Sequence, residues 1–196
     1  MQASFFERIG AYFIDLIVVG ILASVITYAL PQNDNDLQNE LNSLLEKINS
    51  NEISSEEYLT EYQNILYQNQ KNSINENTLG LVITVAYFIV FGYLNKGRTI
   101  GKLALKIKIV DSENKLEPSF GRILLRSIIP YGILSTTINL ILINLISKHS
   151  YLNIYYLIGA AEIIFIVVTI FLISSKKPGL HDMLAHTEVI KEERRG

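Results

Sequence analysis

The sequence predicts an all-α membrane protein built as a bundle of four transmembrane helices, and three observations support this class. Hydrophobic residues make up 49% of the 196, and the mean hydropathy is +0.26 even though residues 31–78 are rich in Asn, Gln, Glu and Ser. Apolar runs such as LVITVAYFIVFGYL lack the polar face that the helices of a soluble bundle show every 3.6 residues. Lysine and arginine gather beside these runs. The lipid bilayer is therefore the first expected partner.

Four apolar runs are candidates for transmembrane helices, and they cover residues 9–30, 79–94, 123–146 and 152–173. Crossing the hydrocarbon layer takes roughly 20 helical residues, so the first, third and fourth runs are long enough and the second is marginal. A cleaved signal peptide is the alternative for the first run. Its length of about 22 apolar residues and the internal Asp15 argue against that alternative.

The basic residues predict the orientation of the spans. They are concentrated at both ends of the chain and in segment 95–122, whereas the other connections hold only Lys47, Lys71 and Lys148. By the positive-inside rule, both termini and segment 95–122 are cytoplasmic. This pattern requires an even number of spans, which favours counting the marginal second run.

Residues 31–78 form an insertion that the sequence predicts to be an extracellular helical hairpin. Apolar residues recur at helical spacing in two stretches, at 37, 41, 44, 45 and 48 and again at 58, 62, 65 and 66. Ser54 and Glu57 fit a capping box at the start of the second helix. The hairpin is either a solvated pair of helices or a docking surface for an extracellular protein partner. Its nine acidic residues also suit attraction of cations to a pore mouth.

Segment 95–122 begins with GRTIGK, which resembles a phosphate-binding loop. Only three residues separate its glycines and Leu103 follows the lysine, so nucleotide binding is discarded. Apolar and mostly basic residues alternate over 103–110. With the DSEN turn, this alternation predicts a short cytoplasmic β-hairpin whose basic face meets anionic headgroups. Ser119 then starts a helix that places Arg122 and Arg126 on one face.

Several classes of function are not supported. The chain has no cysteine, so disulfides, thiolate metal sites and cysteine nucleophiles are excluded. Its basic residues form no solvated stripe with interleaved aromatics, so no nucleic-acid binding is expected. His181 and His186 are five residues apart and no glutamate completes a zinc site, so we expect no metal and no other cofactor. No nucleophile, base and oxyanion site can be assembled, so the protein is not expected to be an enzyme. The sequence leaves a homo-oligomer open.

Asp15 interrupts the first apolar run. A carboxylate in hydrocarbon must be protonated, paired or open to water. Asp15 lies in the cytoplasmic third of its span, at the level of residue 129 of the third span, so Arg126 is its expected partner. The pair is either purely structural or part of a transport path.

Glu162 interrupts the fourth run near its middle. Counting residues across the SKHSY turn places it opposite Thr136 and Thr137, with Asn139 nearby. Asp15, Glu162, Thr136 and Asn139 are therefore the candidate ion or proton pathway. The alternative is a protonated Glu162 that simply donates a hydrogen bond to Thr136. Pro130 either frees a backbone carbonyl for an ion or only kinks the third helix.

A cytoplasmic polar cluster is expected where these spans end. Asp182 follows the last run and can cap a short helix or pair with an arginine. The members of the cluster are Arg8, Asp15, Arg122, Arg126 and Asp182. It would act as a lock that holds the inner end of the bundle or as a gate that opens during transport.

Four motifs in order resemble the RDD family, which is named for one arginine and two aspartates. They are ERIGAYFIDLIV, NKGRTIGKLALKIKIVD, FGRILLRSI and GLHDMLAHTEVI. The naming residues correspond to Arg8, Asp15 and Asp182. The resemblance implies a single RDD domain over 1–196 in a bacterial cell membrane, with multiple spans and an association with transport, including cation/proton antiport for some members. The insertion at 31–78 is not part of the family pattern.

Two hypotheses follow for function. The first is transport of a cation, with proton coupling as one form, or of a small solute, with Asp15 and Glu162 as carriers. The alternative is a non-enzymatic membrane binding protein or immunity-like protein whose outer hairpin recognises a protein partner while the buried charges are only structural.

Overall fold

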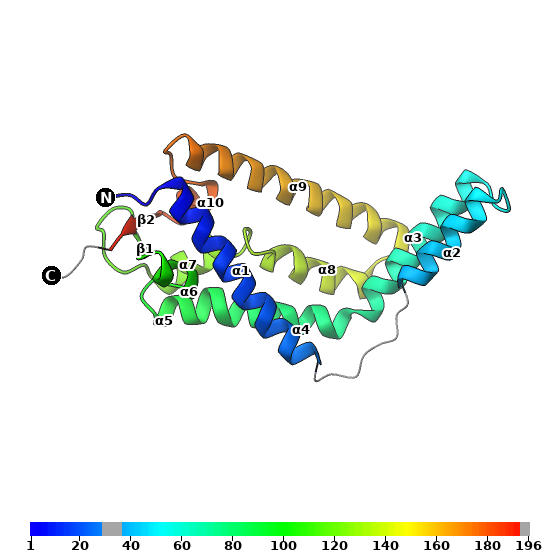
Figure 1. The fold of residues 1–196 in the computed structure, drawn as a ribbon, viewed down its shortest axis with the longest axis horizontal. Helices are drawn as coiled ribbons and strands as arrows, with labels where there is room; N and C mark the ends of the chain where they lie inside the picture. The colour runs from blue at the N-terminus through cyan, green and yellow to red at the C-terminus, as the bar shows by residue number, and fades with distance from the viewer. Residues whose placement is uncertain (29–36, 193–196) are drawn as a thin grey trace.

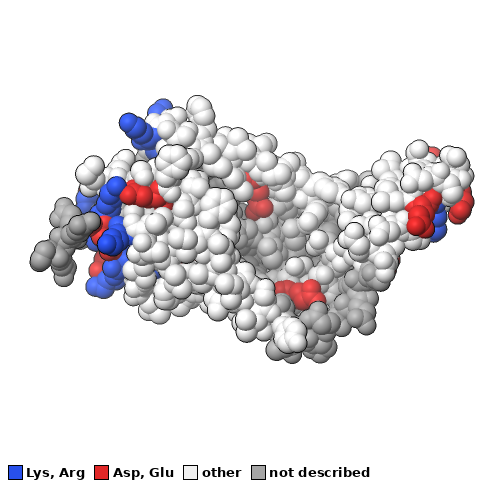
Figure 2. Space-filling model, viewed as in Figure 1, with Lys and Arg blue, Asp and Glu red and all other residues white. Residues whose placement is uncertain are grey.

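The computed structural model describes residues 1–28 and 37–192, and the chain is mostly helical. Figure 1 shows an elongated molecule in which the N-terminus and the last strand lie at one end and a helical hairpin projects at the other. Three stretches are long and apolar enough to cross a membrane: Phe5–Ile26, Ile74–Leu94 and Lys148–Ser174. We call the end with the N-terminus the basic end, because Lys and Arg gather there in Figure 2.

The three long stretches expose apolar side chains along much of their length. α1 (Phe5–Tyr28) leaves Phe13, Ile17 and Ile21 exposed, and α9 (Lys148–Ser174) leaves Ile163 and Val167 exposed. Figure 2 shows no Lys or Arg in the middle of the face that it draws, between the two charged ends, and acidic atoms at only a few places there. Such a belt is the surface that a bilayer covers.

The second long stretch contains a π-helical turn. α4 (Ile74–Val85) continues through η1 (Ala86–Phe91) into the short α5 (Gly92–Leu94). A π-turn widens the helix, so the consecutive residues Tyr87, Phe88 and Ile89 are all buried, which the stripe of a regular α-helix would not allow. Two of these side chains form part of the site described below.

The third apolar run does not form the single helix expected over 123–146, and that prediction was wrong. It divides into α7 (Phe120–Ser127) and α8 (Ile133–Leu145), and α8 has 13 residues, too few to cross the hydrocarbon layer alone. The break contains Pro130, which has no backbone donor, and Gly132, whose positive φ of 67° is left-handed. Across it, the Leu134 N–H donates to the Ile128 carbonyl at 2.9 Å.

The predicted β-hairpin is also wrong, although a strand does form. β1 (Ile107–Asp111) pairs antiparallel with β2 (Thr187–Lys191), from the other end of the chain. The DSEN turn follows β1, but the chain then runs into α7 instead of returning. Residues 103 and 105 lie before the strand, at the end of α6 (Ile100–Ala104) and just after it. The sheet thus ties segment 95–122 to the C-terminal segment.

The outer helices form as expected where the structure describes them. α2 (Leu37–Asn49) and α3 (Ser55–Asn72) pack together, and the Ser54–Glu57 capping box is confirmed. The start of the insertion, 31–36, lies outside the described residues. Tyr67 of α3 anchors the hairpin to the neighbouring ends of α8 and α9, because its hydroxyl donates to the Ile143 carbonyl at 3.2 Å and its ring meets Tyr151 edge-on.

α6 packs against α1 through a glycine. A Cβ on Gly101 would lie 2.1 Å from the Ala11 carbonyl oxygen and 2.9 Å from Asp15 Cγ. Backbone and carboxylate cannot move aside without separating the two helices. This close approach is what brings the turn before α6 to the Asp15 side chain.

We expect Gly101→Ala to destabilise the protein by about 1–3 kcal/mol, because a methyl group forced against backbone separates α6 from α1. Thermal unfolding in detergent, followed by circular dichroism, measures the change. Gly121→Ala on α7 is the control: its Cβ would meet nothing within 4 Å, so it should leave stability unchanged or raise it by about 0.5–1 kcal/mol. Equal unfolding temperatures for the two variants would contradict the close packing of α6 against α1.

Candidate functional site

The Asp15 carboxylate is fully buried and is held by four groups, three hydrogen-bond donors and one ammonium. Oδ1 accepts from the Tyr87 hydroxyl at 2.6 Å and from the Gly101 N–H at 2.7 Å. Oδ2 accepts from the Thr99 hydroxyl at 2.5 Å and lies 3.6 Å from Lys102 Nζ. A carboxylate with this many donors is stable as an anion away from water.

Three of those groups come from the GRTIGK segment, which runs into α6. Thr99 is in extended conformation just before α6, so its side chain, the Gly101 N–H and Lys102 all point to the same carboxylate. The Lys102 ammonium is buried and also donates to the Thr99 hydroxyl at 3.0 Å. Burial lowers the pKa of Lys102 to about 8, because desolvation of the ammonium outweighs the attraction of Asp15.

Asp182 forms a second buried centre beside the first. Its Oδ1 pairs with Arg126 Nη1, and its Oδ2 lies 3.4 Å from Arg8 Nη1. The Gly179 N–H donates to Oδ2 at 3.3 Å, so Asp182 also caps α10 (Leu180–Leu184). Arg8 further donates to the carbonyls of Ala3 and Val189 at 3.2 and 3.4 Å. The start of α1, α7 and the C-terminal segment are held together here.

The expected pair between Asp15 and Arg126 is wrong. Lys102 binds Asp15, and Arg126 binds Asp182 and the Thr187 hydroxyl. Helix counting missed Lys102 because it lies in the short helix α6, outside the spans. The signal was available in the GRTIGK turn, whose glycine permits close approach to another backbone. Arg122 is not part of either centre: it pairs with Asp111 Oδ2 at 2.6 Å and donates to the His186 carbonyl at 2.7 Å.

His181 lies against Asp182 without forming an ion pair. Its Nε2 is 3.6 Å from Asp182 Oδ2. Burial, together with the charges of Arg126, Lys102 and Arg8, holds the pKa of His181 well below its usual 6.5, so the ring is neutral at pH 7. Among the described residues its Nδ1 has no hydrogen-bond partner.

A layer of aromatic rings lies next to the centres formed by Asp15 and Asp182. The Tyr131 ring stacks on Phe88, with ring centroids 3.4 Å apart, and on Tyr12 at 5.8 Å. Tyr131 belongs to the break between α7 and α8, and Phe88 to the π-turn. Both irregular segments therefore contribute to the same layer.

Glu162 lies in a different place, on the side of this layer away from the basic end. It lines a cavity of about 540 Å³ between α8 and α9, together with Ser135, Thr136 and Asn139. We call this the outer cavity. Among the described residues no side chain pairs with Glu162, and the buried Asn139 Oδ1 accepts no hydrogen bond. Asp15 does not line the outer cavity, so the structure does not bring the two carboxylates of the expected pathway together.

Residues 1–28 and 37–192 contain no metal site built from the usual side chains. No group of three His, Asp or Glu side chains in those residues is close enough to hold a metal ion. The outer cavity instead offers one carboxylate with amide and hydroxyl oxygens, a set that suits a weakly held hard cation or a polar solute.

Comparison with known proteins gives a family. The model of the RDD family matches residues 2–186. No curated protein and no solved structure matches the chain. The match spans Arg8, Asp15 and Asp182, and their correspondence to the residues for which the family is named stays a prediction from the sequence.

We expect Asp15→Asn to lower the free energy of unfolding by about 3–5 kcal/mol, because it leaves the buried Lys102 ammonium without its anion. Lys102→Met should cost less, because Asp15 keeps three donors. Lys71→Met, on the exposed face of α3, is the control and should change stability by less than about 0.5 kcal/mol. Thermal unfolding in detergent measures all three, and a smaller loss for Asp15→Asn than for Lys102→Met would contradict the assignment.

We expect stability to fall as the pH drops below 6.5 because of His181. Below this pH the His181 ring takes up a proton in the unfolded chain but stays neutral in the folded protein. The nearby cations Arg8, Lys102 and Arg126 disfavour its protonation, and the nearby Asp182 does not outweigh them. The loss approaches about 1.4 kcal/mol per pH unit. Unfolding temperatures of the native protein and His181→Gln between pH 7.5 and 5.5 measure the effect. Parallel pH curves would show that His181 is not a buried neutral group.

Proposed function

Because the chain belongs to the RDD family and has apolar helices that mark it as a membrane protein, we propose that it transports a cation or a small polar solute. The observation that carries this proposal is the outer cavity, with the unpaired Glu162 carboxylate in its wall. A membrane helix gains nothing structural from an unpaired carboxylate near its middle, whereas a carrier needs one to bind its cargo or a proton.

The lining of the outer cavity supports a cationic cargo. Glu162 supplies charge, and Ser135, Thr136 and Asn139 supply neutral oxygens around it. Asn139 Oδ1 accepts no hydrogen bond from the described residues, and a bound cation would give this buried oxygen a partner. At about 540 Å³ the cavity also has room for a hydrated ion or a small solute. Figure 2 shows acidic atoms in the hollowed middle of the face that it draws.

The charge distribution supports a bacterial cell-membrane orientation with the basic end inside. Lys and Arg gather where the N-terminus, α6 and the sheet lie. The α2–α3 hairpin would then be extracellular, and the outer cavity, which Gln70 and Asn77 also line, would face the outside. The acidic hairpin would concentrate cations near its mouth.

The inner end is closed in this arrangement. The stack of Tyr12, Tyr131 and Phe88 separates the outer cavity from the basic end, and Asp15 and Asp182 are tied by the contacts described above. Transport would require Tyr131 to move, and the break at 128–132 supplies backbone that can rotate without unwinding either helix. Asp15 would then serve as part of an inner gate, while Glu162 serves as the binding group.

The competing hypothesis is a membrane binding protein whose hairpin recognises another protein. Leu45 and Leu59 are exposed on the hairpin and would suit such contact. This hypothesis gives the outer cavity no role and predicts no flux.

We expect Glu162→Gln to reduce cation flux at least tenfold, because the amide keeps the shape of the side chain but removes its charge. The measurement uses the purified protein in liposomes loaded with dyes for Na⁺, K⁺ and H⁺. Glu76→Gln is the control, because Glu76 is exposed on α4 and does not line the cavity. It should transport like the native protein.

Two outcomes would overturn the proposal. One is a Glu162→Gln variant that transports cations as fast as the native protein and whose circular dichroism shows that it is folded. The other is the absence of flux above that of empty liposomes for every cation and small polar solute tested, which is what the binding hypothesis predicts.

A further inference from the structure

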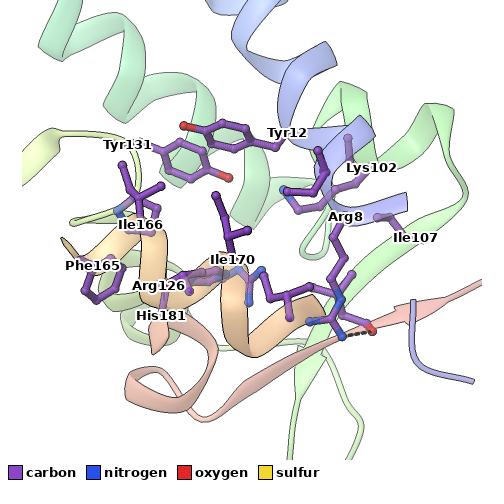
Figure 3. A pocket seen from close by; sticks show the side chains of 16 residues that line it. Arg8, Tyr12, Lys102, Ile107, Arg126, Tyr131, Phe165, Ile166, Ile170 and His181 are labelled. Carbon is purple, nitrogen blue, oxygen red and sulfur yellow. Dashed lines mark hydrogen bonds between the residues drawn. The ribbon is translucent and has the colours of Figure 1, made fainter. Parts of the chain in front are cut away.

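A second cavity lies at the basic end, between α1 and α9. Its volume is about 130 Å³, and we call it the inner cavity. Figure 3 shows Arg8 and Lys102 on one side of it, Arg126 and His181 on another, and the stacked rings of Tyr12 and Tyr131 across one end. It does not include Glu162 or Asn139, so it is separate from the outer cavity.

The charges around the inner cavity do not balance. Arg8, Lys102 and Arg126 line it as cations. Two carboxylates pair with them, Asp15 and Asp182. Glu188 acts on Arg8 from a longer distance, but it is itself paired with Lys115 at 2.8 Å. One positive charge is left over in a place from which water is largely excluded, because Lys102 and Arg126 are each 6% exposed. Buried surplus charge is unfavourable and is relieved by a counterion.

Polar groups facing the inner cavity also lack partners. Thr169 is 8% exposed, and its buried Oγ1 has no hydrogen-bond partner among the described residues; His181 Nδ1 is in the same state. Both residues line the cavity. The Arg126 guanidinium, in the part of the chain that the structure describes, has acceptors only for Nη1. Donors therefore remain for an anion that enters.

The rest of the lining is hydrocarbon. Phe165, Ile166, Ile170 and Ile173 of α9 form one wall. Ile166 and Ile170 are also about two-fifths exposed on the surface that we assign to lipid. The cationic part of the cavity is thus continuous with an apolar face of a membrane helix. A small hydrophilic anion would leave this wall unfilled, and a cation would be repelled.

We propose that the inner cavity binds the phosphate of an anionic membrane lipid, with the headgroup near Arg126, Thr169 and His181 and the hydrocarbon chain along Ile166 and Ile170. The phosphate neutralises the surplus charge and accepts from the free guanidinium and hydroxyl donors. Helices α1 and α9 make few direct contacts with each other. The lipid would therefore stabilise the junction of α1, α7 and α9. This site is independent of the transported cargo.

The test measures lipid binding in detergent, with no flux assay, so it can fail or succeed separately from the transport proposal. Native mass spectrometry and thermal unfolding are carried out with added phosphatidic acid, with phosphatidylcholine, and with inorganic phosphate. We expect phosphatidic acid to bind saturably with one copy per chain and to raise the unfolding temperature. Phosphatidylcholine should bind at least tenfold more weakly, because its headgroup carries no net charge.

Two variants locate the binding. Thr169→Val keeps the shape of the side chain and removes the unpartnered hydroxyl, and we expect it to weaken phosphatidic acid binding about tenfold. Ile170→Trp fills the hydrocarbon wall and should weaken it by a similar factor. Thr137→Val on α8 is the matched control, because the Thr137 hydroxyl bonds the Ile133 carbonyl and lines neither cavity. It should bind like the native protein.

Three results would overturn the proposal. The first is equal binding of phosphatidic acid and phosphatidylcholine, which would indicate a general lipid surface. The second is unchanged binding by Thr169→Val and Ile170→Trp, which would place the lipid at surface lysines instead. The third is equally tight binding of inorganic phosphate, which would show a site for a free anion with no part for the hydrocarbon chain.

Discussion

Burial of the Asp15 carboxylate is the constraint on which the rest of this structure depends. An anion without water needs donors on every side, and α1 can supply none of them because its own backbone groups are used by the helix. The donors come from Tyr87 in the π-turn and from Thr99, Gly101 and Lys102. The requirement therefore fixes α6 against α1, and α6 leads directly into β1.

The buried Asp182 carboxylate also needs donors around it, and it obtains them from other segments than Asp15 does. Asp182 gathers arginines from two helices and caps the short helix to which it belongs. Since β2 follows at once and pairs with β1, the two buried carboxylates are connected through the sheet as well as through space. The basic end is thus one polar assembly in which removal of either carboxylate leaves a buried cation without its anion. Such an assembly is stable when complete and prone to open as a unit.

The irregular parts of the helices lie where function is proposed. The π-turn at 86–91 interrupts a stretch long enough to cross a membrane, and the break at 128–132 separates α7 from α8. Both segments place a ring in the stack of Phe88, Tyr131 and Tyr12. On one side of this stack is a cavity with an unpaired carboxylate, and on the other is a cavity with surplus positive charge. The opposite electrostatic character of the two cavities favours different occupants, a cation in the outer one and an anionic lipid in the inner one.

The sequence by itself determined which segments belong in lipid and where several helices begin, because hydropathy and capping are local properties of neighbouring residues. Three of the expected apolar runs, 9–30, 79–94 and 152–173, overlap the long stretches of the structure. The Ser54 capping box and the helix start at Ser119 also follow from such local signals. Only the tertiary structure decided the partners: Lys102 for Asp15, Asp182 for Arg126, and β2 for β1. Counting along an unbroken helix placed Arg126 beside Asp15, but the break at Pro130 and Gly132 changes the position of α7. The short helix α6, distant in sequence from Asp15, supplies the nearer cation. Partner choice depends on where separate segments meet in space, and that is a property of the whole fold.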